Sequence, residues 1–351
     1  MPETVRARSV ELAVEFNGAD ITKDIRPYLL SAVYTDCEDD DADDLQLTLQ
    51  DRAEVWASKW LGEALSKTLS GGLKIKAAIR RLNASPGTAP LVLPCGTFEL
   101  AEFEFSGPPH AITLSATAFG FSSGARDTMR SRAWKNARLS AIAGEVAGRA
   151  GLALRFDAPN DPFYKNKQQK KKSDASFLSG LCKDAGFSMK ATGTELIIFD
   201  QSVYEAKPPV MTVKPGPDIL KFTCRAGAAG TGYDRCRVRW TKPDTGELIE
   251  GLATAPGFDG ADGEGRTLEV TAPVQTAAEA NELAAKKLRA RNRFANTASI
   301  TLPGNVFLAA GQTVMLDSFG VFSGKYFVYR AKHSLGGKGY RTELELRAIG
   351  G

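Results

Sequence analysis

Side chains that commonly carry catalysis are scarce in this sequence. Only two histidines, His110 and His333, occur among the 351 residues. His110 follows two prolines in a predicted turn, and His333 lies in an alternating strand pattern. Neither is near a nucleophile motif such as G-x-S-x-G. The sequence therefore gives little support for a histidine relay or a histidine-rich metal site. The sequence predicts a protein that is not an enzyme, with no catalytic, cofactor-binding or metal-binding residues.

The carboxylates leave one catalytic alternative open. Asp and Glu together number 41. Two carboxyl groups that flank a glycosidic bond can cleave it. Because such a pair forms in space, it leaves no recognisable spacing in the sequence, and a glycoside-cleaving function stays as the enzymatic alternative.

The five cysteines are scattered along the chain, at Cys37, Cys95, Cys182, Cys224 and Cys236. Their number is odd and none forms a C-x-x-C motif. This pattern predicts reduced thiols in a cytosolic product, and it argues against a disulfide framework and against a zinc site.

An acidic run, Glu38–Asp44, is the most conspicuous charge feature. Three alternate positions from Asp39 are acidic, as in a calcium loop, but Asp44 stands where the turn glycine belongs and Gln50 where the last ligand belongs. Six carboxylates in seven residues repel one another. We expect a solvated loop that does not pack; a second interpretation is a channel wall whose negative potential repels nucleic acid.

A basic run, Lys165–Lys172, lies in a polar stretch and has no interleaved aromatic residue apart from Tyr164. Such runs supply salt-dependent affinity for phosphates, so nucleic-acid binding is one interpretation. A mobile loop between elements is the interpretation that we favour. The helix that carries Lys286 to Arg293 is also basic, but cations near a helix C-terminus complement its dipole without any ligand.

The overall composition is that of a globular protein. Lys and Arg number 45, which gives a net charge of +4, and 43 % of the residues are hydrophobic. A chain of this length usually forms two or three domains. No apolar run reaches the roughly 18 residues that span a bilayer, and no secretory signal follows the first residues. We expect the chain to remain in the cytoplasm where it is made.

Hydrophobic periodicity predicts strands in the first and last parts of the chain and helices in the middle. Helical spacing indicates helices at Leu139–Ala150 and Ser173–Ala185, and Gly151 and Gly186 supply their C-caps. A T-x-x-E capping box at Thr276 begins a later helix. The remaining expected elements are a helix around 53–65 and strands around 10–16, 45–50, 73–79, 98–100, 112–114, 195–199, 219–225, 236–241, 298–302, 313–316, 326–335 and 340–349.

Two hairpins resemble one another. Gly96–Leu100 and Gly324–Val328 both begin with Gly-x-aromatic-x-aliphatic, and each is followed by a turn and an alternating strand. A chance match between two hairpins is one explanation. The other is an internal repeat, in which one chain carries two copies of one β domain.

Four stretches, taken in order, resemble a known family: the phage late control protein D family, the baseplate hub proteins of contractile phage tails and related contractile injection systems. The lysine run at 165–172 and the loop at 256–265 depart from the family pattern, so the kind of particle stays open. The stretches that carry the resemblance are Asn17–Thr22 with Asp43–Asp51; Gly96–Leu100 with Ser106–Pro109 and Leu114–Ala116; Trp134, Leu139 and Ile142–Leu152 with Ser173–Leu178; and Ala277–Ala280 with Val328–Leu335, Gly339–Tyr340 and Thr342–Leu346.

The resemblance implies an α+β, mainly β fold. In this fold, two similar antiparallel β-barrel domains of the tube type are separated by a small α/β domain. The implied domains are residues 1–120 for the first barrel, 121–207 for the α/β insert and 208–351 for the second barrel. The resemblance also implies a homotrimer, in which three chains present six similar units to a sixfold tail tube and hold a threefold spike on the other side.

The expected function is therefore that of a structural baseplate hub, which adapts the sixfold tube to the threefold spike and forms part of the central channel. Its expected partners are two further copies of itself, the tail spike protein, the tail tube protein and other baseplate proteins. DNA or a tape measure passes through the channel without specific binding, and neither a cofactor nor membrane insertion is expected. The expected location is the virion tail baseplate, assembled in the host cytoplasm.

Two alternatives from other classes stay open. One is a tail-associated peptidoglycan hydrolase. The other is a nucleic-acid-binding regulator, which would need its lysines clustered on one face and a steep salt dependence of DNA affinity.

Overall fold

The computed structural model describes residues 9–38, 42–52, 54, 72–83, 88–118, 128–227, 232–258 and 265–349. The chain divides into two units. Unit 1 comprises Met1–Tyr204, Thr301–Gly311 and Tyr329–Leu344, and unit 2 comprises Glu205–Ile300, Gln312–Val328 and Glu345–Gly351. The structure is mostly β and its strands are chiefly antiparallel, as predicted from the sequence.

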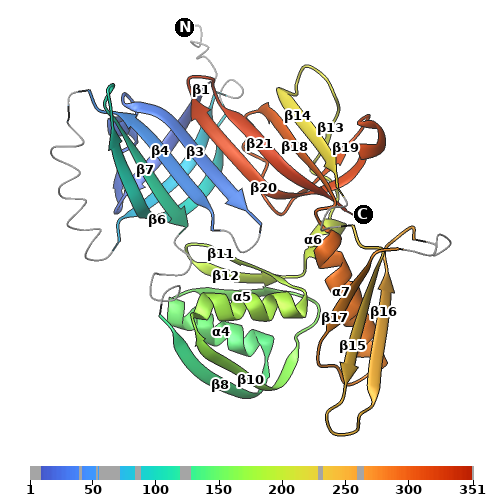
Figure 1. Cartoon of the computed structure of the whole chain (residues 1–351). Coiled ribbons are helices and arrows are strands. Elements are labelled where there is room, and N and C mark those ends of the chain that lie inside the picture. Colours follow the sequence, from blue (N-terminus) through green and yellow to red (C-terminus); the bar gives the residue numbers. More distant parts are fainter. Residues whose placement is uncertain are drawn as a thin grey trace. The chain divides into compact units, whose positions relative to one another are not determined.

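An antiparallel sheet forms the N-terminal part of unit 1 (Figure 1). Its strands follow the order β3-β4-β7-β6-β5-β1-β2, and residues Arg330–Gly336 pair with β3 on its other side. The strands predicted in this part of the chain are confirmed, whereas the helix predicted around 53–65 falls, apart from Glu54, outside the described residues. The elements are β1 (Ser9–Phe16), β2 (Ala19–Asp20), α1 (Thr22–Ile25), β3 (Leu29–Cys37), β4 (Asp44–Gln50), β5 (Lys74–Leu82), β6 (Leu91–Ser106) and β7 (Ala111–Ala118).

The core of this sheet follows from the alternation of its strands. In β4 the side chains of Leu45, Leu47 and Leu49 are buried, while the residues between them are more exposed. Residues two apart in a strand lie on one face, so a single register buries all three leucines. Burial of each such side chain contributes about 2 kcal/mol.

The middle of unit 1 is an α/β insert. It consists of a two-stranded ribbon, β8 with β10, two helices, and a three-stranded sheet in the order β11-β12-β9, where β12 runs parallel to β9. Its own core includes Trp134, whose ring stacks on Phe177. The elements are β8 (Arg130–Arg138), α4 (Leu139–Ala150), β9 (Ala153–Asp157), β10 (Phe163–Lys172), α5 (Asp174–Ala185), β11 (Ser188–Ala191), β12 (Glu195–Phe199) and α6 (Gln201–Ala206).

The two helices of the insert begin and end where the sequence predicts. The Ser173 hydroxyl accepts a hydrogen bond from the Ser176 amide at 3.3 Å and caps α5. Gly151 and Gly186 have φ of 72° and 79°, the left-handed conformation that ends a helix at low cost for glycine. These caps fix the lengths of α4 and α5.

Unit 2 contains a second group of paired strands. β14 pairs with β18, β18 with β21, and β21 with β20; β19 pairs antiparallel with β20 and parallel with β13. β18, β20 and β21 have residues in both units. The elements are β13 (Met211–Val213), β14 (Lys221–Ala226), β18 (Asn296–Pro303), β19 (Thr313–Leu316), the short 3-10 helix η2 (Gly320–Phe322), β20 (Gly324–Gly336) and β21 (Arg341–Ala348).

A separate module of unit 2 packs one helix on three strands. Its sheet has the order β16-β15-β17, from β15 (Arg235–Thr241), β16 (Leu248–Thr254) and β17 (Thr267–Thr271), and α7 (Ala277–Asn292) covers it. A Cβ at Gly251 would lie 2.3 Å from the carbonyl carbon of Ala280, so the helix approaches the strand as closely as glycine allows. The predicted capping box is confirmed: the Thr276 hydroxyl accepts from the Glu279 amide, and the Glu279 carboxylate accepts from the Gln275 amide.

Two expectations about the architecture stay predictions. These are the closure of the two β regions as barrels and the domain boundaries at 120 and 207. Each of the two similar hairpins forms a pair of neighbouring strands, β6 with β7 and β20 with β21. No helix in the described part of the chain is long and apolar enough to cross a membrane.

Candidate functional site

His333 is a structural side chain in β20. It is fully buried, and its Nε2 donates to the Leu308 carbonyl at 3.0 Å, which leaves Nδ1 to accept from the Tyr340 hydroxyl at 2.8 Å. Burial lowers the pKa of His333 to about 4. The imidazole is therefore neutral and holds the backbone of the 305–311 segment against β20.

His110, the other histidine, lies in the turn between β6 and β7. Its Nδ1 is 3.6 Å from a Glu54 carboxylate oxygen, and its ring packs edge-on against Phe105. The side chain is partly exposed. The structure does not bring His110 and His333 together, because each imidazole packs and bonds with a different set of residues.

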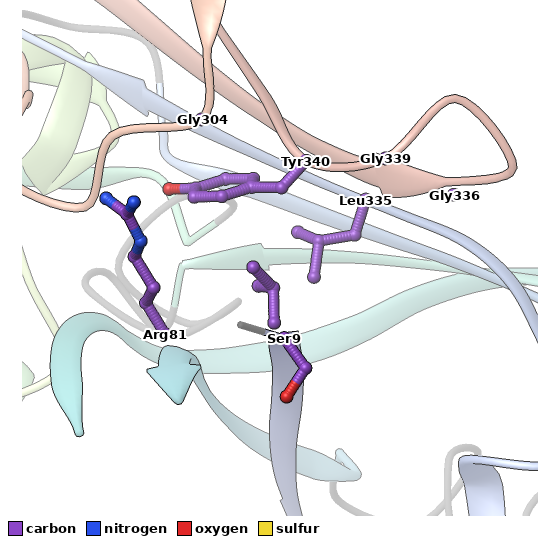
Figure 2. Close-up of a pocket in the computed structure, with 8 residues that line it drawn as sticks. Ser9, Arg81, Gly304, Leu335, Gly336, Gly339 and Tyr340 are labelled. Atoms are coloured by element: carbon purple, nitrogen blue, oxygen red, sulfur yellow. The ribbon is translucent and has the colours of Figure 1, made fainter. Parts of the chain in front are cut away.

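One pocket of about 430 Å³ opens in unit 1 (Figure 2). Ser9, Val10, Arg81, Leu335 and Tyr340 line it, together with three glycines. Burial raises the pKa of Tyr340, so among these lining residues only the Arg81 guanidinium is charged at neutral pH. A Cβ at Gly304 would lie 2.0 Å from the Tyr340 ring, so the glycine makes room for that ring. The lining residues include no acid–base pair, and the pocket is a by-product of aromatic packing.

Glu38 and Asp43 of the acidic run are buried, whereas Asp44 at its end is exposed, which corrects the expectation of a solvated loop that does not pack. Glu38 and Asp43 are 4 % and 8 % exposed, while 39–41 lie outside the described residues. Asp43 accepts from the Cys37 amide at 2.9 Å and pairs with the Lys190 ammonium at 3.1 Å. Lys190, which neutralises Asp43, lies in β11 far along the chain, so the acidic run alone does not predict this pairing. Within the described residues, no three His, Cys, Asp or Glu side chains gather as metal ligands.

All five cysteines are free thiols, as predicted, and four of them are buried. Burial raises the pKa of Cys95 to about 12 and raises the pKa of Cys236 as well. Both thiols are therefore protonated at neutral pH and are poor nucleophiles.

The lysine run is a strand, which corrects the expectation of a mobile loop. β10 pairs antiparallel with β8 from Phe163 opposite Arg138 to Lys172 opposite Arg130. Gln169 is 1 % exposed, and its amide nitrogen donates to Asp174 at 2.9 Å and to the Lys172 carbonyl at 2.8 Å. The run escaped prediction because both faces of this strand are polar, so no apolar alternation marks it.

Unit 2 carries exposed apolar side chains beside a strand that, among the described residues, pairs on one side. β14 ends the order of paired strands, next to β18. Phe222 of β14 is 49 % exposed, and its ring packs edge-on against the Phe319 ring with 5.3 Å between the ring centroids. Val321, in η2 directly after Phe319, is 96 % exposed. Apolar groups beside an open strand edge are typical of a surface that another chain covers.

The fold matches those of solved phage tail proteins. No protein-family model and no curated protein matches this chain. The tail protein from Neisseria meningitidis MC58 is similar to it over 97 % of each chain, with a TM-score of 0.73 and 13 % sequence identity. The 43 kDa tail protein of prophage MuSo2 from Shewanella oneidensis is similar over 97 % of this chain and 98 % of its own, with a TM-score of 0.66 and 15 % identity.

A third similar structure comes from a secretion system. It is an E. coli protein described as a component of the type VI secretion system, with structural similarity to T4 bacteriophage tail proteins; the match covers 96 % of this chain and 76 % of that one, with a TM-score of 0.53 and 10 % identity. The sequence resemblance pointed to phage tail and related proteins, and these solved structures of similar fold are tail proteins and a secretion-system component.

Proposed function

We propose that this chain, which has the fold of phage tail proteins, is the structural hub of a contractile tail baseplate or of a related phage-tail-like particle. As a homotrimer it adapts a sixfold tail tube to a threefold spike and forms part of the central channel, without catalysis. It assembles in the host cytoplasm and stays in the baseplate. The observation that carries the proposal is the match with a tail protein over 97 % of both chains.

Two further observations support an assembly role. His333 and four of the five thiols are buried, and the His110 ring packs against Phe105. The open edge of β14, with Phe222 and Val321 exposed beside it, offers backbone and apolar surface to a neighbouring chain. In a ring of identical chains such an edge meets a different surface of the next copy.

The test is the solution mass of the purified chain by sedimentation equilibrium, alone and mixed with the spike protein of the same particle. A species of about three times the 37.6 kDa monomer in either sample is the expected result. A monomer in both samples, without any association with the spike, would overturn the proposal.

A pair of variants locates the contact. Phe222→Asp places a charge beside the open edge, and Val92→Asp places the same charge at a 50 % exposed position of β6 in unit 1. We expect the first variant to shift the mass toward monomer and the second to leave it unchanged. If both variants sediment as trimers, the contact lies away from β14, and the hub proposal rests on the wild-type mass.

A further inference from the structure

We infer that the ribbon of β8 and β10 binds the phosphate backbone of duplex DNA without reading its sequence. The ribbon is the densest positive surface of the described chain that two paired strands form. β8 has four Lys or Arg residues and β10 has five, and neither strand contains Asp or Glu. This concentration stands out against a net charge of only +4 for the whole chain.

Arg138 donates to the Asp161 carbonyl at 3.1 Å, and the other eight cations of the ribbon fall into two groups. Three of them have acidic partners near the helices: Arg130 with Asp174 at 3.5 Å, Arg132 with Glu145 at 2.8 Å, and Lys167 with Asp184 at 3.9 Å. Figure 1 shows that α4 and α5 lie between this ribbon and β11 with β12. The paired cations therefore serve the packing of the insert.

The second group has no ion pair within the described part of the chain. It consists of Lys135 in β8 and Lys165, Lys170, Lys171 and Lys172 in β10, and all five side chains are exposed. Charges that a fold uses for its own stability have partners, whereas none of these five has an acidic partner among the described residues. They are available to a polyanion outside the chain.

The ribbon presents a flat polar face between these lysines. Asn166 lies opposite Lys135, and Gln168 lies opposite Ala133, and directly opposite residues of an antiparallel pair share a face. The small Ala133 leaves that face without a protruding apolar group. A two-stranded ribbon of this kind fits a groove of B-form DNA, where its lysines reach the flanking phosphates.

The lysine triplet departs from regular strand geometry. The pairing shifts between Gln169 and Lys172, and Lys171 has φ of 44°. Glycine and asparagine adopt that left-handed conformation more readily than lysine. A lysine at this position therefore adopts a strained backbone conformation.

The lack of apolar groups favours DNA over a protein or a membrane. The cores of protein interfaces are enriched in aromatic residues and depleted of lysine, and membrane-surface helices need a broad apolar face. On the ribbon only Phe163, 54 % exposed, is a large exposed apolar residue, and it lies at the end away from the lysine triplet. Affinity for a phosphate backbone needs cations alone.

The test is fluorescence anisotropy of a labelled duplex of mixed sequence, titrated with the full chain at several salt concentrations. The ribbon variant carries Lys170→Gln, Lys171→Gln and Lys172→Gln. The control variant carries Lys23→Gln, Lys332→Gln and Lys338→Gln, three exposed lysines elsewhere, so both variants lose the same net charge. Circular dichroism and thermal unfolding establish that both are folded.

We expect the wild type and the control variant to bind alike, and the ribbon variant to bind about tenfold or more weakly at low salt. The slope of log affinity against log salt should become shallower by about 0.9 for each phosphate that the variant no longer neutralises, up to about 3 in total. Equal affinity of the two variants would overturn the inference. The inference would also be overturned if poly-glutamate competed for the ribbon as well as DNA of the same total charge, because the ribbon would then recognise acidic protein. DNA affinity and oligomeric state are measured in separate experiments, so failure of this inference and failure of the hub proposal are distinguishable.

Discussion

Two ion clusters of opposite composition, each built around buried carboxylates, hold the α/β insert in unit 1 and the α7 module in unit 2. In unit 1, Lys190 of β11 lies between two carboxylates: its Nζ is 2.5 Å from Asp36 and 3.1 Å from Asp43, and it donates to the Cys37 carbonyl at 2.8 Å. In unit 2 the arrangement is inverted. One carboxylate, Glu205, accepts from Arg289 of α7 and, at 2.6 Å, from Arg347 of β21.

The inversion predicts different responses to pH. Two carboxylates around one ammonium leave an excess negative charge, which a proton on one carboxylate removes. Burial raises the pKa of Asp43 to about 6, although Lys190 acts to lower it, and the neighbouring Asp36 raises it further. Guanidinium groups do not release their protons in this range, so the unit 2 cluster keeps its positive excess. The charge of the unit 1 cluster therefore changes as Asp43 titrates near pH 6.

The largest expected effect comes from Lys190→Met. The variant leaves Asp36 and Asp43, whose side chains are each 10 % exposed, without their cation. Removing one partner of a buried pair costs about 3 kcal/mol or more. Hydrogen exchange of the β3 and β11 amides measures the loss as local opening, which suits a chain with several folding units.

Lys338→Met is the matched control, because Lys338 is exposed in the turn after β20. It should leave exchange in β3 and β11 unchanged. If Lys190→Met lowers the opening free energy by less than about 1 kcal/mol, Lys190 contributes no more than a surface ion pair and the comparison fails in unit 1.

Glu205→Gln tests the inverted cluster and should cost about 2 kcal/mol. Glutamine keeps one oxygen as an acceptor, but the charge that compensates Arg347, 3 % exposed in its side chain, is removed. The Lys325 ammonium donates to the backbone carbonyl of Glu205, which the substitution preserves. Exchange of the β21 and α7 amides reports the change.

Glu282→Gln supplies the control on α7, where Glu282 is 64 % exposed and pairs with Lys286. A loss of stability in this control equal to that of Glu205→Gln would mean that any glutamate near α7 matters equally. The special position of Glu205 between two arginines would then have no energetic consequence.

Neither cluster could be predicted from the sequence, and the reason is distance along the chain. Lys190 lies 154 residues from Asp36, and Arg347 lies 142 residues from Glu205. The acidic run was visible, but nothing nearby indicated which lysine would neutralise it. By contrast, α4 and α5 were predicted closely, because large apolar residues at helical spacing and a terminal glycine are local signals.

The module around α7 shows a further limit of sequence patterns. Its helix was predicted from the capping box at Thr276 and β15 from the pattern at 236–241, but β16 and β17 were not predicted. The helix packs through Ala280 and Ala284, and the sheet receives it at Gly251. Small residues bury little apolar surface each, so a close backbone contact produces a weak hydrophobic pattern. The ribbon of β8 and β10 was missed because polar residues occupy both faces of most of β10, so no apolar alternation marks it.

The smallest expected effect, and the sharpest test of the comparison, is the titration of Asp43. The folded pKa of about 6 exceeds the ordinary value of 3.8, so the folded state holds a proton that the unfolded state has released between about pH 4 and pH 6. The contribution of Asp43 to the free energy of unfolding therefore falls as pH rises through that window and is constant above it. Carboxyl carbon NMR of Asp43 should show a midpoint near 6.

Two variants test the direction and the cause of the pKa shift of Asp43. In Lys190→Met the midpoint of Asp43 should move upward, because the ammonium that favours the ionised carboxylate is gone. Asp43→Asn should remove the dependence of β3 exchange on pH in that window, while exchange in β21 beside Glu205 keeps its wild-type profile. A midpoint near 4 in the wild type, or a downward shift in Lys190→Met, would show that solvent rather than Lys190 stabilises the carboxylate. The two ion clusters would then differ in composition but not in their response to pH.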